Sequence, residues 1–227
     1  MPAAPFRLFG PDHLVALAVV GAAAVAVPLA VRRRPEGRAA RLLRPGLAAA
    51  LLLLTALTTY GVSRERRLGV WDFLPLHLCD AAIFLAAFAL VTRRRASAEL
   101  LYFWAFAGTS LAMITPDLWV GAPDWHFLSF FAIHGMVVVS AATLAFGLGA
   151  GPRPGGARRA FLLTNMYAAA IAVVDAAFEQ NFLYLRARPE ARTLLDAFGP
   201  WPWYILPCEI LAAGAFRLLE VPFRGRR

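Results

Sequence analysis

The sequence predicts an all-α fold, a polytopic bundle of membrane-spanning helices. Of its 227 residues, 60% are hydrophobic and only 16% are charged, whereas about a quarter of the residues in a soluble domain carry charge. The apolar residues also cluster into long runs, close to the roughly 17–25 residues that a helix needs to cross a bilayer. Proline and glycine punctuate the intervals between the runs. Together these features place the chain among integral membrane proteins.

The apolar runs predict about seven transmembrane helices in a single domain over residues 1–227. The fourth and sixth runs are the weakest, because each is short or interrupted by polar groups. The sequence shows no internal repeat and no separable linker. The predicted spans are 12–31, 44–62, 72–92, 98–115, 126–148, 159–179 and 201–220.

The arginines predict the orientation of the bundle. The formal net charge is +9, and every basic residue other than histidine is an arginine. Cytoplasmic loops are rich in such residues. One side of the predicted bundle carries Arg32, Arg33, Arg34, Arg38, Arg41, Arg44, Arg93, Arg94, Arg95, Arg153, Arg158, Arg159, Arg224, Arg226 and Arg227, and the other carries Arg7, Arg64, Arg66, Arg67, Arg186, Arg188 and Arg192. We therefore expect the N-terminus outside and the C-terminus in the cytoplasm, with five of the six tryptophans at the outer boundary.

The composition also excludes several classes of function. The arginines lie in short loops between apolar runs, so they record topology and contact anionic lipid rather than nucleic acid. Two cysteines, Cys79 and Cys208, are too few for a disulfide framework and lack zinc-finger spacing. A cleaved signal peptide is disfavoured, because the positive charge follows the first apolar run instead of preceding it.

Polar residues inside the predicted spans concentrate in the outer half of the membrane. At 1.5 Å per residue, His77, Cys79 and Asp80 lie about 8–12 Å below the outer rim, and His134 and Glu209 lie at about 12 Å and 10 Å. The same half holds Asp12, His13, Asp117, His126, Asp175, Glu179, Asn181 and Tyr184, whereas Asn165 lies nearer the cytoplasm. Polar groups in spans are costly and usually face a cavity, so one shared pocket is predicted.

Cys79 and His134 are the predicted nucleophile and base of that pocket. A cysteine nucleophile needs a base, and His134 has the right depth on another helix. His77 would point away from Cys79 on a regular helix and would share a face with Asp80. Cys79 as a buried apolar residue or as a disulfide partner of Cys208, and His134 as a packing residue, remain alternatives.

The other polar residues have structural alternatives as well. Asp117 follows a proline and suits a turn, and His13 and His126 suit a solvated position at the rim. Asp175 and Glu179, four residues apart, would repel on one helix face, which favours a bound cation, an arginine partner or a raised pKa. Glu209 could orient a histidine or contact a substrate.

The motifs resemble those of the YwaF-type bacterial integral membrane proteins. The resemblance runs from Phe9 to about Arg217, and it is carried by Leu74–Cys79, Thr115–Asp117, Phe130–Gly135, Asn181–Pro189, Leu194–Asp196 and Gly199–Tyr204. That family is similar to a eukaryotic transmembrane acyltransferase that places polyunsaturated acyl chains on lyso-ether-phospholipids and depends on a cysteine and a histidine. By matching motif, the resemblance implies Cys79 and His134 as that pair.

The sequence therefore predicts a membrane lipid acyltransferase or transacylase in the bacterial plasma membrane. Cys79 would act as nucleophile and His134 as base, with an oxyanion donor from Asn181, Tyr184 or His77. Phospholipid and lysophospholipid are the expected substrates, without a cofactor and without nucleic acid. A zinc-dependent intramembrane hydrolase using His77, Asp80, Asp117 and His134, with Cys79 as an additional candidate ligand, is one alternative. A non-enzymatic carrier is another.

Overall fold

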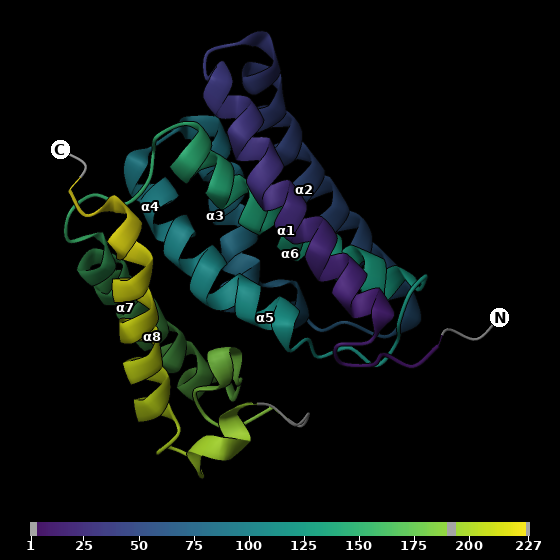
Figure 1. Ribbon diagram of the computed structural model, residues 1–227. Coiled ribbons are helices and arrows are strands. Elements are labelled where there is room, and N and C mark those ends of the chain that lie inside the picture. Colours follow the sequence, from purple (N-terminus) through teal and green to yellow (C-terminus); the bar gives the residue numbers. More distant parts are fainter. Residues whose placement is uncertain (1–3, 190–193, 226–227) are drawn as a thin grey trace. The chain divides into compact units, whose positions relative to one another are not determined.

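The computed structural model describes residues 4–189 and 194–225 and is helical (Figure 1). Within these ranges, the extended backbone forms a single isolated bridge between Pro5 and Val120. The prediction of an all-α polytopic bundle is therefore confirmed. The predicted positions of Arg192, Arg226 and Arg227 lie outside the described residues.

Six helical stretches are long and apolar enough to cross a membrane. They are Pro11–Arg33, Arg38–Glu65, Val70–Thr92, Arg95–Ile114, Trp125–Gly147 and Gly156–Phe178. They match the first six predicted spans, with ends that differ by a few residues. The largest difference is in the second span, where the helix begins at Arg38 and continues through Pro45.

The seventh predicted span corresponds to a shorter helix, α8 (Ile205–Glu220). Its 16 residues extend about 24 Å at 1.5 Å per residue, less than the roughly 30 Å of a bilayer core. The predicted span began at Trp201, but residues 201–204 form turns. Pro200 precedes these turns and Pro202 lies within them. Proline lacks the N–H that continues a helix, so α8 begins after them.

The chain divides into two compact units. The first comprises residues 1–75 and 79–151, and the second comprises Leu76–Leu78 with residues 152–227. The division falls inside the predicted single domain, whose unity remains a prediction. Each unit is described separately below.

The first unit is organised around α6 (Trp125–Ala142) and its π-helical continuation η3 (Thr143–Gly147). Of the span formed by α6 and η3, 72% is buried, against 11% for α1. Figure 1 shows α1 lying along α6, and α2, α4, η2 and α5 also pack on α6. The remaining elements are α1 (Pro11–Arg33), α2 (Arg38–Glu65), η1 (Val70–Phe73), α3 (Leu78–Thr92), α4 (Arg95–Phe103), η2 (Trp104–Thr109) and α5 (Ser110–Ile114).

The second unit is built on a helix pair, α7 (Gly156–Phe178) and α8. Short 3-10 turns accompany the pair: η4 (Phe182–Tyr184), η5 (Leu194–Phe198) and η6 (Val221–Phe223). The Oε1 atom of Glu220 accepts a hydrogen bond from the Ala157 N–H at 3.2 Å, and Asn165 Nδ2 donates to Glu209 Oε2 at 3.0 Å. Early α7 residues thus meet late α8 residues, so the two helices run antiparallel.

Candidate functional site

Cys79 is a half-buried free cysteine in the first turn of α3. It forms no hydrogen bond with a described residue, and Cys208, in the second unit, is also a free thiol. The disulfide alternative therefore has no support in the structure. A free thiol at a helix start retains the chemistry that a nucleophile requires.

His134 lies in the middle of α6 with a fixed ring orientation. Its Nδ1 is 2.8 Å from the carbonyl oxygen of Phe130, one turn earlier, and its ring stacks on the Phe130 ring at a centroid distance of 4.1 Å. A carbonyl oxygen only accepts hydrogen bonds, so Nδ1 carries the hydrogen. The lone pair of a neutral His134 is therefore on Nε2, the nitrogen suited to take a proton.

The structure does not join Cys79 and His134 by a hydrogen bond. Asp80 lies beside Cys79 in the first turn of α3, and Asp117 is exposed in the loop after α5. Among the described residues, no three histidine, cysteine, aspartate or glutamate side chains come together as a metal-binding group. Asp80, Asp117 and His134, the members of the zinc alternative's core ligand set that lie in the first unit, are thus not gathered into a metal-binding group.

His77 is not on a helix, which corrects the predicted pairing with Asp80. The sequence placed both residues on one face of a span that starts at Asp72, but α3 begins only at Leu78. Pro75 lacks the N–H needed for a regular turn there. The His77 ring instead contacts two aromatic rings of the second unit, Phe182 at 5.1 Å and Tyr184 at 5.9 Å between centroids.

A tightly wound loop follows α7 in the second unit. Glu179, Leu183 and Tyr184 have φ angles of 55°, 55° and 56°, in the left-handed region that side chains other than glycine and asparagine rarely occupy. Non-glycine residues remain in such conformations only when the surroundings hold them. Contacts within the second unit must therefore hold this loop in its conformation.

Asn181 and Arg186 hold this loop in place. Asn181 Oδ1 accepts from the N–H groups of Arg186 and Ala187, both at 3.0 Å, and its Nδ2 donates to the Ala187 carbonyl at 2.9 Å. Arg186 Nη1 donates to the Asp175 carbonyl oxygen at 3.0 Å. The Asn181 amide thus holds the loop, and Asn181, Tyr184 and His77 stay the predicted oxyanion donors.

Asp175 and Glu179 do not share a helix face. Asp175 is fully buried, and its Oδ1 accepts from the Phe182 N–H at 3.0 Å, while its Oδ2 has no hydrogen-bond partner among the described residues. Glu179 ends α7 and is exposed. An arginine does reach Asp175, as one of the open alternatives supposed, but Arg186 binds the backbone carbonyl and not the carboxylate.

Tyr184 and Glu209 are the remaining predicted site residues of the second unit. The Tyr184 carbonyl accepts a hydrogen bond from the Tyr204 hydroxyl, so the loop is tied to the start of α8. The carboxylate of Glu209 faces α7, where it accepts from Asn165. Asn165 was the residue predicted to lie away from the polar band, so the Glu209 carboxylate lies toward the middle of α7.

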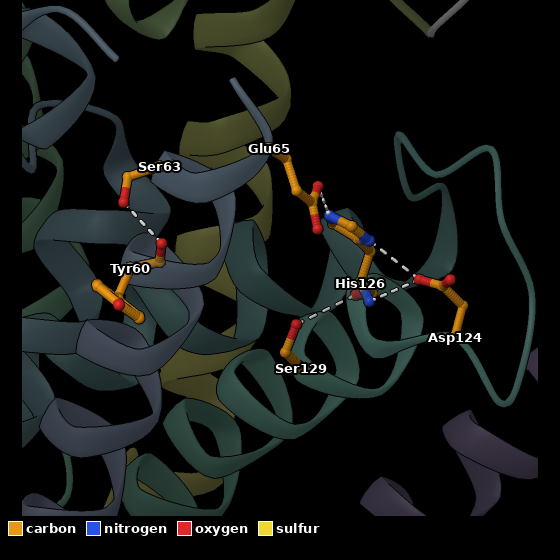
Figure 2. Close-up of polar contacts among 6 residues, drawn as sticks. All are labelled: Tyr60, Ser63, Glu65, Asp124, His126 and Ser129. Carbon is orange, nitrogen blue, oxygen red and sulfur yellow. Dashed lines mark hydrogen bonds and ion pairs between the residues drawn. The ribbon is translucent and has the colours of Figure 1, made fainter. Parts of the chain in front are cut away.

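His126 bridges two carboxylates at the start of α6 (Figure 2). Its Nε2 lies 3.0 Å from Glu65 Oε2 at the end of α2, and its Nδ1 lies 3.0 Å from Asp124 Oδ1. Asp124 also caps α6 by accepting from the His126 N–H at 2.8 Å, and this bond lowers the pKa of the Asp124 carboxyl. The nearby Ser129 hydroxyl donates to the His126 carbonyl and not to the ring, so the group is a structural link and not a catalytic triad.

His13 is fully buried, which corrects its predicted solvated position at the rim. Its Nδ1 accepts from the Phe9 N–H at 2.9 Å, and its Nε2 lies 2.8 Å from the Met113 carbonyl oxygen at the end of α5. His13 therefore anchors the segment before α1. Sequence reasoning could not find this role, because Met113, whose carbonyl oxygen binds Nε2, lies 100 residues away along the chain.

The chain matches the model of a known protein family. The profile of the TMEM164 family, a transmembrane family, matches residues 8–220. No curated protein and no solved structure matches the chain. Because the profile covers nearly the whole chain, from the segment before α1 to the end of α8, this protein belongs to the TMEM164 family.

Proposed function

We propose that this protein transfers acyl chains between membrane lipids, with Cys79 as nucleophile and His134 as general base. The observation that carries the proposal is the bond from His134 Nδ1 to the Phe130 carbonyl. It places the basic lone pair of the imidazole on Nε2, as a proton acceptor requires. Membership of the TMEM164 family and the resemblance of the Cys79 and His134 motifs to those of a lipid acyltransferase support the same reaction class.

The proposed reaction has two steps, acylation of Cys79 and then its deacylation. In the first, Cys79 Sγ attacks the carbonyl carbon of a phospholipid ester while His134 takes the thiol proton. The ester C–O bond breaks, a thioester forms, and His134 returns the proton to the departing lysophospholipid alkoxide. In the second, the hydroxyl of an acceptor lysophospholipid attacks the thioester, and its proton passes through His134 back to the Cys79 thiolate.

Proton transfer requires the Cys79 thiol and His134 Nε2 to come within hydrogen-bonding distance during this cycle. The two side chains are not hydrogen-bonded to each other in the structure. Catalytic hydrogen bonds are often long without substrate and tighten in the complex. Both residues belong to the first unit, so the nucleophile and the base lie in one unit. Asn181, Tyr184 and His77 stay predicted oxyanion donors.

The proposed location is the outer half of a bacterial plasma membrane. The arginine distribution supports this orientation, and the outer face supplies no soluble acyl-coenzyme A. Exchange between two lipids is therefore the form of transfer that we propose.

The test uses purified protein in bilayers that contain a phospholipid with a labelled acyl chain and an unlabelled lysophospholipid. Mass spectrometry follows the label in wild type, Cys79→Ala and His134→Ala, each with and without a chelator. Cys208→Ala is the matched control, because Cys208 is the other free cysteine and has no proposed role. We expect label on the acceptor for wild type and Cys208→Ala, and a loss of at least about 100-fold for the other two variants.

The competing functions give different results. Transfer or hydrolysis that survives Cys79→Ala but stops with the chelator would indicate the zinc-dependent hydrolase. No transfer and no released fatty acid across a varied lipid panel would exclude both enzymes and leave a carrier. A hydroxylamine-sensitive acyl label on wild type that is absent from Cys79→Ala would identify the thioester directly.

A further inference from the structure

A narrow apolar groove of about 500 Å³ runs between α1 and α6 in the first unit. At Gly135 the two helices touch, since a Cβ atom added there would lie 2.7 Å from Val20 Cγ2. Ala16 and Ala132 also line the groove, and their short side chains leave its space open. The residues around them, such as Val19, which is 62% exposed, present apolar surface outward.

A smaller pocket of about 220 Å³ adjoins the groove at the start of α1. Asp12 lines both cavities, and the consecutive residues Gly121 and Ala122 line the pocket and the groove respectively. Arg7 lines the pocket as well. A positively charged side chain, Arg7, and a negatively charged one, Asp12, therefore lie at one end of the apolar groove.

The pocket is held in shape by the buried His13. Its ring accepts from the Phe9 N–H and binds the Met113 carbonyl, which fixes the segment that carries Arg7 against the end of α5. The Phe6 N–H donates to the Trp119 carbonyl at 3.0 Å, and the Gly121 N–H donates to the Ala4 carbonyl at 2.7 Å. Hydrogen bonds within the protein thus define the wall of the pocket, as in the largely pre-formed sites that bind small molecules.

We propose that the groove and pocket together bind one membrane phospholipid with a primary ammonium in its headgroup, of the phosphatidylethanolamine type. One acyl chain lies between α1 and α6, the phosphate pairs with Arg7, and the ammonium pairs with Asp12. A primary ammonium donates up to three hydrogen bonds to a carboxylate, whereas a quaternary ammonium donates none and a glycerol headgroup carries no cation.

The dimensions favour a lipid chain over a protein partner. The stretch of α6 that lines the groove, from Phe127 to Val139, is about 18 Å long at 1.5 Å per residue. A helix of that length and about 10–12 Å across fills roughly 1,400–2,000 Å³, well beyond the groove. Sites of about 300–1,000 Å³ are typical for small ligands.

Neither Cys79 nor His134 lines the groove or the pocket. The inference therefore goes beyond the proposed transfer reaction and stands without it, because its readout is binding and not turnover.

The experiment uses full-length protein in bilayers with a phosphatidylethanolamine that carries a photoactivatable group on one acyl chain. After irradiation, peptide mass spectrometry locates the label in wild type, Ala132→Phe and Ala16→Phe, which fill the groove. Ala49→Phe on the exposed face of α2 is the matched control. We expect label on peptides from α1 and α6, reduced at least about fivefold by either groove variant and unchanged by Ala49→Phe.

The headgroup is tested separately by native mass spectrometry. Bilayers contain equal amounts of phosphatidylethanolamine, phosphatidylcholine and phosphatidylglycerol. We expect wild type to retain the ethanolamine lipid preferentially and Asp12→Asn to lose that preference. Arg7→Gln should weaken retention of all three, while Arg67→Gln, an exposed arginine elsewhere, should not.

Label spread evenly over lipid-facing helices, or label on α1 and α6 that the groove variants leave unchanged, would overturn the proposal. Equal retention of the three lipids by wild type would overturn its headgroup part. Circular dichroism and thermal melting verify that each variant is folded, and Asp12→Asn, which leaves the packing of α1 on α6 unaltered, decides the question if a phenylalanine variant does not fold.

Discussion

The histidines of this chain differ in what their ring nitrogens contact, and those contacts set their roles. His13 is buried between two backbone groups, His126 lies between two carboxylates, and His134 is held at Nδ1 by its own helix. His77 has aromatic neighbours. Of the four, His134 has a ring fixed in the tautomer that a general base requires.

Replacement of His13 by alanine should destabilise the first unit. The change leaves the Phe9 N–H and the Met113 carbonyl without their partner, and each buried unsatisfied group costs about 1–3 kcal/mol. We expect a lower thermal midpoint in detergent for His13→Ala. His13→Gln, which retains one donor and one acceptor, should recover part of the loss, and equal midpoints for all three proteins would contradict the anchoring role.

The Asp124 cap predicts a pH dependence. Its carboxyl has a lowered pKa in the folded protein because it accepts from the His126 N–H and ring. A lowered pKa stabilises the fold above the unfolded-state pKa, and this contribution disappears as the pH falls through the folded-state pKa. Wild type should therefore be more stable than Asp124→Asn at neutral pH, and the difference should vanish on acidification. A constant difference in thermal midpoint from neutral to acidic pH would refute this.

At the scale of elements, the start of α3 and the loop after α7 were not predicted from the sequence. The hydrophobic runs located six spans, because run length and composition decide whether a helix can cross a bilayer. The start of α3 was wrong, since proline geometry at Pro75 overrides the apolar pattern. The loop from Glu179 to Tyr184, with its left-handed residues, was not predicted either. Contacts that form only on folding hold it in place, such as the bond from Arg186 to the Asp175 carbonyl.

Glu220 links the end of α8 to the start of α7. Its carboxylate accepts from the Ala157 N–H in the first turn of α7, where unpaired N–H groups and the helix dipole favour negative charge. Glu220→Gln should keep the bond but lose the charge, and Glu220→Ala should lose both, at about 1.5–3 kcal/mol for the charged bond. Hydrogen exchange of the first turn of α7 is the measurement, with faster exchange expected in the order wild type, Gln, Ala.

At the scale of the whole molecule, the sequence predicted the class and the orientation rule but not the division into two units. Composition and the spacing of arginines along the chain are local properties. Which helices pack together depends on complementary surfaces, such as Gly135 against Val20, that no single run displays. The lipid groove between α1 and α6 was missed for this reason, and so was the burial of His13.

Orientation itself is a whole-molecule prediction. The arginine count predicts the N-terminus outside and the C-terminus in the cytoplasm. Reporter fusions at the two ends, active only on one side of the membrane, should report opposite sides. Identical sides would require an even number of crossings, and α8 is the element to reassign, because it is the shortest of the predicted spans.

The membership of Leu76–Leu78 in the second unit has a consequence for biosynthesis. The ribosome releases His77 long before it makes Phe182 and Tyr184, the rings that His77 contacts, or Tyr167, whose hydroxyl binds the Leu76 carbonyl. Leu76 and His77 therefore lack these partners while most of the first unit is inserted. The contacts of Leu76 and His77 form only after α7 and its following loop have left the ribosome, so a nascent chain arrested earlier lacks them however well its first helices have assembled.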